Sequence, residues 1–175
     1  MATNRWKTVL PKLDVQGKLK PVKEKALREC ERTYEFLLPK SYRDFCKVFG
    51  AGFLTEPTNY EIQVPGAKEI RYTLCPNVYG NPELEPDGWD PESFIRFKRG
   101  WVFASDIAPN VYFWDPHELT VPQDNEYAIY VIEHEELKAE RLADTFWAFV
   151  NEICLSPGPP DHPKGNFELR FVPVE

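Results

Sequence analysis

The sequence predicts an α+β fold with a central antiparallel or mixed β-sheet flanked by helices. Two observations lead to this class. Apolar residues recur at helical spacing near the N-terminus and again after residue 142, whereas the region between them shows the alternating or continuous apolar runs that are typical of strands. The predicted order is therefore two helices, a run of strands, one helix and a last strand.

A single domain is expected over residues 21–175, preceded by an N-terminal arm over residues 1–20. The chain has 175 residues, of which 42% are hydrophobic. A domain of this size buries enough surface to form a core without disulfides or metals. Residues 1–20 contain scattered apolar positions with no sustained period, so we expect the arm to be loosely attached.

Two short helices follow the arm. Pro21 suits the first turn of a helix whose apolar face consists of Leu27, Cys30, Tyr34 and Leu37. Pro39 ends this helix and begins the next, because proline disfavours a helical conformation before it and presets the turn after it. The apolar stripe of the second helix consists of Tyr42, Phe45, Cys46 and Phe49. Gly50 and Gly52 end it and are expected to turn the chain toward the sheet.

Strands are predicted over the middle of the chain. Tyr60, Ile62 and Val64 alternate with polar residues before a turn at 65–66. Residues 101–107 and 111–114 are aromatic and β-branched runs joined at 108–110, which predicts a hairpin. Residues 127–132 are continuously apolar, as expected for a central strand buried on both faces.

A helix and a strand are predicted near the C-terminus. The helical stripe consists of Leu142, Phe146, Phe149, Val150 and Ile153. The proline-rich residues 156–160 end this helix, and residues 167–171 then alternate as a last strand with one solvent-exposed face. Earlier in the chain, residues 76–91 form a long loop rich in proline and acidic residues, followed by a short helix over 94–97.

The charge balance argues against several classes of ligand. The chain has 28 Asp+Glu and 21 Lys+Arg, a net charge of −7, whereas nucleic-acid binding needs concentrated positive charge. The basic cluster at Lys18, Lys20, Lys23 and Lys25 is interrupted by Glu24 and is typical of a solvated helix start. No apolar run is long enough to span a bilayer, and the N-terminus has no signal-peptide core. We therefore expect a cytoplasmic protein without membrane association.

No metal or cofactor is predicted. Cys30, Cys46, Cys75 and Cys154 are too far apart in sequence for a CxxC motif, and the histidines form no zinc-binding spacing. In a cytoplasmic protein we expect these cysteines to be reduced thiols. No glycine-rich loop opens a helix as a phosphate site would require.

Two groups of titratable residues are candidates for catalysis. His134 lies among Glu133, Glu135 and Glu136, where carboxylates would orient the imidazole and raise its pKa, but a polar junction between strand and helix explains the same residues. Asp106, Asp115 and His117 flank the predicted hairpin, but aspartates are common in turns for conformational reasons. No nucleophile signature accompanies either group. The sequence therefore predicts a protein that is not an enzyme, with no catalytic residues.

The long loop provides the candidate partner-binding site. Trp89 lies in it among acidic and proline residues, and tryptophan is enriched at interface hot spots. The acidic residues of this candidate site are Glu83, Glu85, Asp87 and Asp90. We expect this surface to bind a basic protein, with Trp89 as the anchor. The alternative is a solvated loop in which Trp89 packs back onto the sheet.

Four segments together resemble the SMI1/KNR4 (SUKH) family. Residues 38–45 (LPKSYRDF) followed by 49–52 (FGAG) are similar to the family's LP..Y..F…NGG signature, although Ala51 stands in place of the first glycine of the pair. Residues 102–106 and 111–115 look like its paired strands, and residues 143–149 resemble its closing helix. The resemblance covers residues 24–155, and the loop over 76–91 departs from the family pattern.

The resemblance implies an α+β fold and a function in binding. In bacteria the family is chiefly associated with immunity proteins that neutralise polymorphic toxins, often nucleases, whereas eukaryotic members act as regulatory scaffolds. Neither role requires catalytic residues. The resemblance therefore implies an immunity protein whose partner is a basic toxin domain, and the alternative is a regulatory or scaffold protein of cell-envelope or stress physiology.

Overall fold

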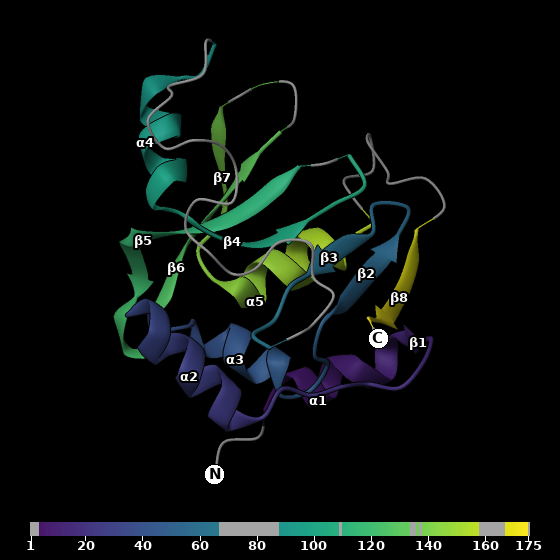
Figure 1. Ribbon diagram of the computed structural model, residues 1–175. Coiled ribbons are helices and arrows are strands. Elements are labelled where there is room, and N and C mark those ends of the chain that lie inside the picture. Colours follow the sequence, from purple (N-terminus) through teal and green to yellow (C-terminus); the bar gives the residue numbers. More distant parts are fainter. Residues whose placement is uncertain are drawn as a thin grey trace.

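The fold is an α+β arrangement built on one eight-stranded mixed sheet (Figure 1). The computed structural model describes residues 4–66, 88–108, 110–133, 136, 138–157 and 167–174. The helical elements are α1 (Trp6–Val9), η1 (Leu10–Lys12), α2 (Glu24–Tyr34), α3 (Lys40–Cys46), α4 (Pro91–Arg99), η2 (Pro122–Asp124), α5 (Phe146–Ala148) and η3 (Phe149–Cys154). The strands are β1 (Asp14–Val15), β2 (Gly52–Glu56), β3 (Tyr60–Ile62), β4 (Trp101–Ser105), β5 (Val111–Val121), β6 (Glu126–Ile132), β7 (Ala139–Ala143) and β8 (Glu168–Pro173).

The strands lie in the order β1-β8-β2-β3-β4-β5-β6-β7. Each neighbouring pair is antiparallel except β1 and β8, which run parallel. The mixed sheet and the α+β class confirm the expectation from the sequence. The predicted hairpin is also confirmed: β4 pairs with β5, and Val102 lies opposite Phe113.

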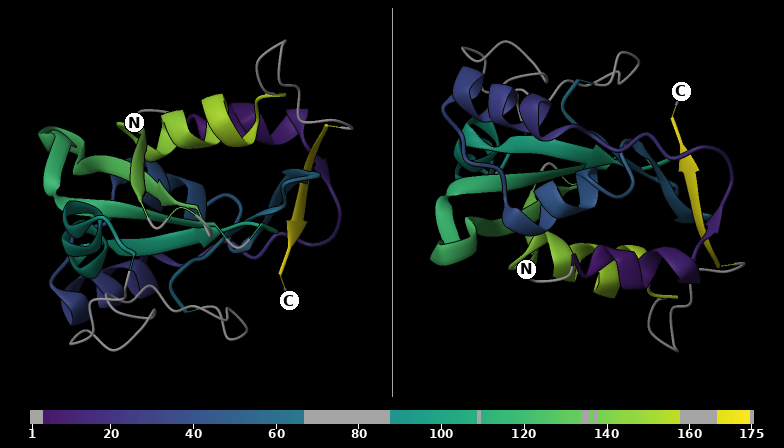
Figure 2. Two further views of the ribbon diagram at one scale, coloured as in Figure 1. Left: turned by 90° about the horizontal axis from the view of Figure 1, so that it is seen from above. Right: turned by 90° about the horizontal axis from the view of Figure 1, so that it is seen from below.

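One face of the sheet, which we call the inner face, carries the main core. Strand residues such as Ile62, Phe103 and Trp114 are at most 1% exposed and pack against α1, α2, α3 and the α5–η3 helix. In Figure 2, α1 and α5 lie side by side along this face. Aromatic rings fill the layer, and Phe103 stacks on Trp114 with 4.2 Å between ring centroids.

The N-terminal segment corrects the expectation of a loosely attached arm over residues 1–20. Trp6 is fully buried, and Val9 and Leu13 are less than 10% exposed. The indole Nε1 of Trp6 donates to the backbone oxygen of Ser41 at 2.7 Å. Strand β1 adds to the edge of the sheet beside β8. Trp6, Val9 and Leu13 therefore attach this segment to the core.

The helix after Pro21 is shorter than its predicted stripe. It ends at Tyr34 because Glu35 adopts a left-handed conformation with φ of 53°. Tyr34, the last residue of the helix, and Leu37, beyond its end, are exposed at 39% and 55%, whereas Leu38 is buried. In contrast, the stripe predicted for the second helix is buried, because all four of its apolar residues are at most 1% exposed. Helix α3 itself ends at Cys46, so Phe49 lies three residues beyond it. Gly50, with φ of +79°, follows α3, and Gly52 begins β2.

The region before the last helix also differs from the prediction. Residues 133–138 connect two strands, so Leu142 lies in β7 instead of a helix. The helix begins only at Phe146, where Thr145 accepts a hydrogen bond from the N–H of Ala148. The predicted strands over 127–132 and 167–171 are present as β6 and β8.

Helix α4 covers part of the opposite face of the sheet, which we call the outer face. Here a second group of apolar residues includes Val102, Phe113 and Tyr130, and Phe97 of α4 packs on Phe113 with centroids 5.4 Å apart. Gly100 permits this approach, because a Cβ at this position would lie 2.3 Å from the Phe113 ring. The helix predicted over 94–97 is present and extends over nine residues.

A cluster of charges joins α2 to α3. The Glu24 carboxylate accepts hydrogen bonds from Lys47 at 2.6 Å, from Arg28 at 3.1 Å and from Arg43. Arg43 also pairs with Glu31. The pKa of Glu24 is lowered to about 2, and the hydrogen bond from Lys47 is the main cause. Arg28 and Arg43 lower the pKa further, whereas burial of the carboxylate opposes the shift. The charged form of Glu24 is therefore stabilised in the folded protein.

We expect Glu24→Gln to lower the free energy of unfolding by about 1 kcal/mol near neutral pH, a small value because the side chain is 39% exposed. Folding lowers the pKa of Glu24 from 4.5 to about 2, so this stabilisation is complete above pH 4.5 and is lost as the pH falls toward 2. Urea denaturation of both proteins across that range measures the difference. Glu29→Gln is the matched control. Glu29 lies in the same helix, and its one ion pair in the described structure, with Lys25, is long at 3.8 Å and therefore weak. A loss equal to that of the control would contradict the assignment.

Candidate functional site

The partner-binding site predicted from the sequence lies next to α4. Trp89 is half-buried: its ring stacks on Phe97 with centroids 5.6 Å apart and meets Phe94 edge-on at 5.7 Å. It also packs against the apolar group of the outer face. Asp90 is the N-cap of α4, because its carboxylate accepts from the N–H of Ser93 at 2.9 Å and from its hydroxyl at 2.7 Å. Those two hydrogen bonds lower the pKa of Asp90.

The other three residues of this predicted site, Glu83, Glu85 and Asp87, lie outside the described residues. The structure therefore shows how Trp89 and Asp90 are held at the start of α4. It leaves their role in partner binding as a prediction.

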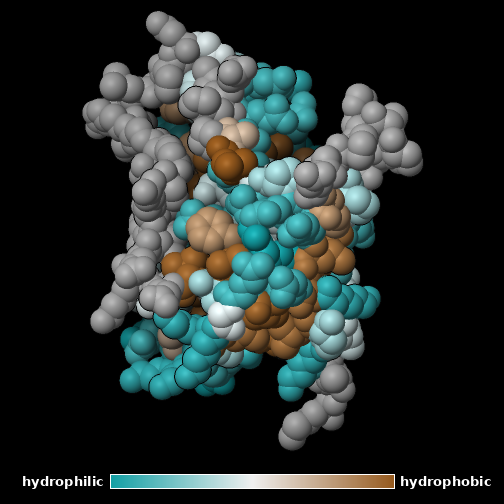
Figure 3. Space-filling model, turned by 90° about the vertical axis from the view of Figure 1, so that its right-hand side faces the viewer, coloured by the Kyte–Doolittle hydropathy of each residue, from teal (hydrophilic) through white to brown (hydrophobic). Residues whose placement is uncertain are grey.

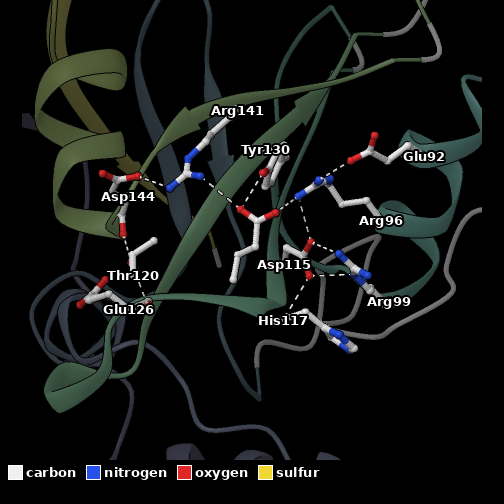
Figure 4. Close-up of polar contacts among 11 residues, drawn as sticks. Glu92, Arg96, Arg99, Asp115, His117, Thr120, Glu126, Tyr130, Arg141 and Asp144 are labelled. Carbon is white, nitrogen blue, oxygen red and sulfur yellow. Dashed lines mark hydrogen bonds and ion pairs between the residues drawn. The ribbon is translucent and has the colours of Figure 1, made fainter.

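Asp115 is the most deeply buried carboxylate of the outer face, with no exposed surface. It follows Trp114 in β5 and accepts four hydrogen bonds (Figure 4). Arg99 donates from Nε at 2.9 Å and from Nη2 at 2.6 Å, Arg96 donates at 3.1 Å, and the N–H of His117 donates at 3.0 Å. Each carboxylate oxygen thus accepts two bonds, which leaves no lone pair for general-base catalysis.

Glu118 extends this network across the sheet. It pairs with Arg96, accepts from the Tyr130 hydroxyl at 2.8 Å and binds Arg141 of β7 at 3.2 Å. Burial raises the pKa of Glu118, but the hydrogen bonds from Arg96 and Tyr130 outweigh it and hold the pKa below its ordinary value. The Arg96 guanidinium also lies 4.2 Å from the centre of the Tyr130 ring. The network fixes α4 against β5, β6 and β7.

Glu126 is a second buried carboxylate, 3% exposed, at the start of β6. It accepts from the N–H and the hydroxyl of Ser41, both at 2.8 Å, and from the N–H of Phe146 at 3.1 Å. Ser41 and Phe146 are in the first turns of α3 and of the last helix. Glu126 therefore anchors the beginnings of two helices to the sheet, a contact between distant segments that the sequence analysis missed.

Among the described residues, the two groups of catalytic candidates form no common site. Asp106 accepts from the N–H groups of Ala108 and Asn110 and from the Tyr112 hydroxyl, so it stabilises the turn between β4 and β5, as turn chemistry predicted. Asp115 and His117 lie beyond the other end of the β4–β5 pairing. Glu133 and Glu136 are exposed, whereas His134 and Glu135 are outside the described residues.

Within the described ranges, no group of three or more His, Cys, Asp or Glu side chains is arranged to hold a metal ion. Cys30, Cys46 and Cys154 are not in disulfide bonds. Burial is the main cause that raises the pKa of Cys30 to about 11. Cys75 is not among the described residues. None of the helices that the structure describes has the length and apolar character needed to cross a membrane.

Comparison with known proteins gives one match. The family model described as SMI1 / KNR4 family (SUKH-1) matches residues 21–152. No curated protein and no solved structure matches the chain. The matched region includes α2, α3, the strands from β2 to β7 and all but the last residues of the helix that follows them.

Proposed function

The chain belongs to the SMI1/KNR4 (SUKH-1) family, and from this membership we propose that it is a non-catalytic cytoplasmic immunity protein that neutralises a bacterial polymorphic toxin. The family match over residues 21–152 carries the proposal. Members of this family are generally non-catalytic, and its bacterial members are chiefly associated with immunity to such toxins. The expected partner is a basic toxin domain, and the toxin class that we expect is a nuclease.

The net charge of −7 supports this choice of partner. A nuclease that binds phosphates carries positive charge, and complementary charge accelerates its encounter with an acidic protein. The buried carboxylates Asp115 and Glu126 are engaged in holding helices to the sheet. Their contacts give both groups a structural role and require no catalytic one.

A regulatory or scaffold role is the second candidate, because eukaryotic family members act in that way. Gene neighbourhood separates the two roles: a toxin gene directly upstream favours immunity. The functional test is co-expression of the chain with the toxin domain encoded beside it. Immunity predicts that cells survive toxin induction only when the chain is present, and equal killing with and without the chain would reject it.

The proposed interface includes the acidic surface at Glu83, Glu85, Asp87, Trp89 and Asp90. We expect Trp89→Ala to increase the dissociation rate of the toxin complex, because a buried aromatic anchor mainly slows dissociation. Replacing Glu83, Glu85 and Asp87 by their amides should slow association and flatten its salt dependence. Asp90 is left unchanged because it caps α4. Surface plasmon resonance at several salt concentrations measures both rates.

Matched controls separate binding from folding. The amide variants of Glu29, Glu35 and Glu152 remove the same charge from exposed positions on other elements. Because Trp89 packs on Phe97, the stability of Trp89→Ala is measured in parallel. If the Trp89 variant and the triple amide variant both fold and bind like the parent, this surface is not the interface.

A further inference from the structure

We propose that a basic surface formed by residues 18–35, which comprise α2 and the segment before it, binds an acidic segment of a protein partner. The cations of this stretch are Lys18, Lys20, Lys23, Lys25, Arg28 and Arg32. The stretch also has four carboxylates, and Arg43 and Lys47 of α3 join it through ion pairs with α2, so the surface has a net charge of +4. The whole chain, in contrast, has a net charge of −7.

The segment before α2 is held in place while its cations stay in solvent. The N–H of Val22 donates to the backbone oxygen of Cys46 at 2.9 Å. Leu19 and Val22 are half-buried and pack against the inner-face core. The exposed cations of the segment are Lys18, Lys20 and Lys23. Because the backbone is already fixed, it loses little conformational entropy when a partner binds.

The surface has more cations than its own carboxylates can pair with. Glu24 accepts from three cations, and Glu31 pairs with Arg43. Glu29 pairs with Lys25 at 3.8 Å, a long distance. Among the described residues, four exposed cations of this surface have no ion pair, whereas Glu35 is its one carboxylate in that state. These four cations are Lys18, Lys20, Lys23 and Arg32. An acidic partner would therefore supply carboxylates that the surface lacks.

Three cations of α2 lie along one side of the helix. Lys25, Arg28 and Arg32 are three and four residues apart, which places them on one face. The first and the last are about 10 Å apart along the axis, because an α-helix rises about 1.5 Å per residue. Together with Glu24 and Glu29 they line a groove of about 470 Å³. Alternate side chains of an extended peptide are about 7 Å apart, so two of its carboxylates can reach this row at once.

The charge pattern favours an acidic peptide over a nucleic acid. Glu24 and Glu29 lie among the cations of the groove and would repel a continuous row of phosphates. The net charge of −7 would also repel a long polyanion. A peptide can carry carboxylates only where the cations are. The side of the molecule that carries β2 and β8 has another character, because apolar surface lies between hydrophilic residues there (Figure 3).

The test uses a defined peptide. The capped peptide acetyl-Glu-Leu-Glu-Leu-Glu-amide is titrated into ¹⁵N-labelled chain at low salt, with acetyl-Gln-Leu-Gln-Leu-Gln-amide as the neutral control. We expect saturable amide shifts over residues 18–32 with the acidic peptide alone, and weaker binding at high salt. The triple variant Lys20→Gln, Lys23→Gln and Arg32→Gln should weaken this binding about tenfold, the effect of losing three exposed charge contacts. Since none of the three has an ion pair in the described structure, their replacement should not disturb the fold.

The matched control removes the same charge elsewhere through Lys7→Gln, Lys12→Gln and Lys138→Gln, at exposed positions outside the basic surface. Helix α1, which carries Lys7, and α2 lie on different sides of the molecule (Figure 2). The control should bind the peptide like the parent. The proposal is overturned if the acidic peptide causes no saturable shift at millimolar concentration, if the neutral peptide binds equally well, or if the control is weakened as much as the triple variant.

A ten-nucleotide oligothymidylate is titrated in parallel. The proposal expects it to bind more weakly than the acidic peptide at the same salt concentration. Tighter binding of the oligonucleotide at the same amides would overturn the proposal in favour of a nucleic-acid partner. The proposal goes beyond the immunity function and does not depend on it, because the toxin is expected at the acidic surface around Trp89.

Discussion

Trp6→Ala will lower the free energy of unfolding by about 3–5 kcal/mol, the range for truncating a large aromatic side chain in a core. Trp6 is fully buried and contacts both Phe45 and Phe146 edge-on, with centroids 5.3 and 6.0 Å apart. The substitution also leaves the backbone oxygen of Ser41 without the hydrogen bond from the indole. Urea denaturation followed by circular dichroism measures the change.

Lys7→Ala is the matched control, because Lys7 neighbours Trp6 in α1 and is exposed. A surface substitution of this kind should change stability by less than about 0.5 kcal/mol. If Trp6→Ala also cost less than about 1 kcal/mol, the N-terminal segment would be the loosely attached arm that the sequence suggests. The core assignment of α1 would then be wrong.

Asp115→Asn will lower the free energy of unfolding by about 3–5 kcal/mol, because it removes the shared partner of two guanidinium groups. Asp115 has no exposed surface, and the side chains of Arg96 and Arg99 are 13% and 34% exposed. The loss should weaken the attachment of α4 and therefore increase the hydrogen exchange of its amides. Urea denaturation gives the total effect, and hydrogen exchange shows where it acts.

A double-mutant cycle with Arg99→Met distinguishes this ion pair from a general effect of the substitution. When Arg99 is already absent, Asp115→Asn should cost less than it does in the parent, since it no longer leaves the charge of Arg99 without its carboxylate. Strictly additive losses would show that the Asp115–Arg99 contact contributes no coupling energy, and the account of how α4 is held would fail.

Local sequence patterns were sufficient for the elements whose apolar face is continuous. The predicted stripe of the second helix identifies one face, and its residues are buried. The aromatic and β-branched runs at 101–107 and 111–114 identify β4 and β5, and residues 101–105 and 111–115 are buried throughout. The N-terminal segment has no such pattern. Trp6 is buried through contacts with Phe45, Phe49, Phe146 and Trp147, which are distant in sequence, so neither period nor propensity could reveal its place in the core.

Strand β7 was missed because one residue fits two patterns. Leu142 is four positions before Phe146, so it extends the helical stripe backwards. Apolar and polar residues do not alternate regularly in the five residues of β7, because Glu140 and Arg141 are adjacent. What makes them a strand is pairing with β6, where Arg141 lies opposite Tyr130. This tertiary contact overrides the local period.

The site was only partly accessible to sequence reasoning. Asp115 was identified as a polar residue of the hairpin, but its burial depends on α4 lying over β5. A usable signal was the spacing of Arg96 and Arg99, which places both guanidiniums on one side of the last turn of a helix. Trp89 packs on Phe97 and against the apolar group of the outer face, contacts that resemble the inward-packing alternative. Its role as an anchor for a partner stays a prediction.

Inhibition of the purified toxin domain by the purified chain tests the central claim most directly. The domain encoded beside the gene is assayed for its own activity, such as nucleic-acid cleavage, while the chain is added in increasing molar ratio. An immunity protein predicts that activity falls linearly and ends near equimolar chain, because tight binding makes the inhibition stoichiometric. Full toxin activity in the presence of excess folded chain would contradict the claim.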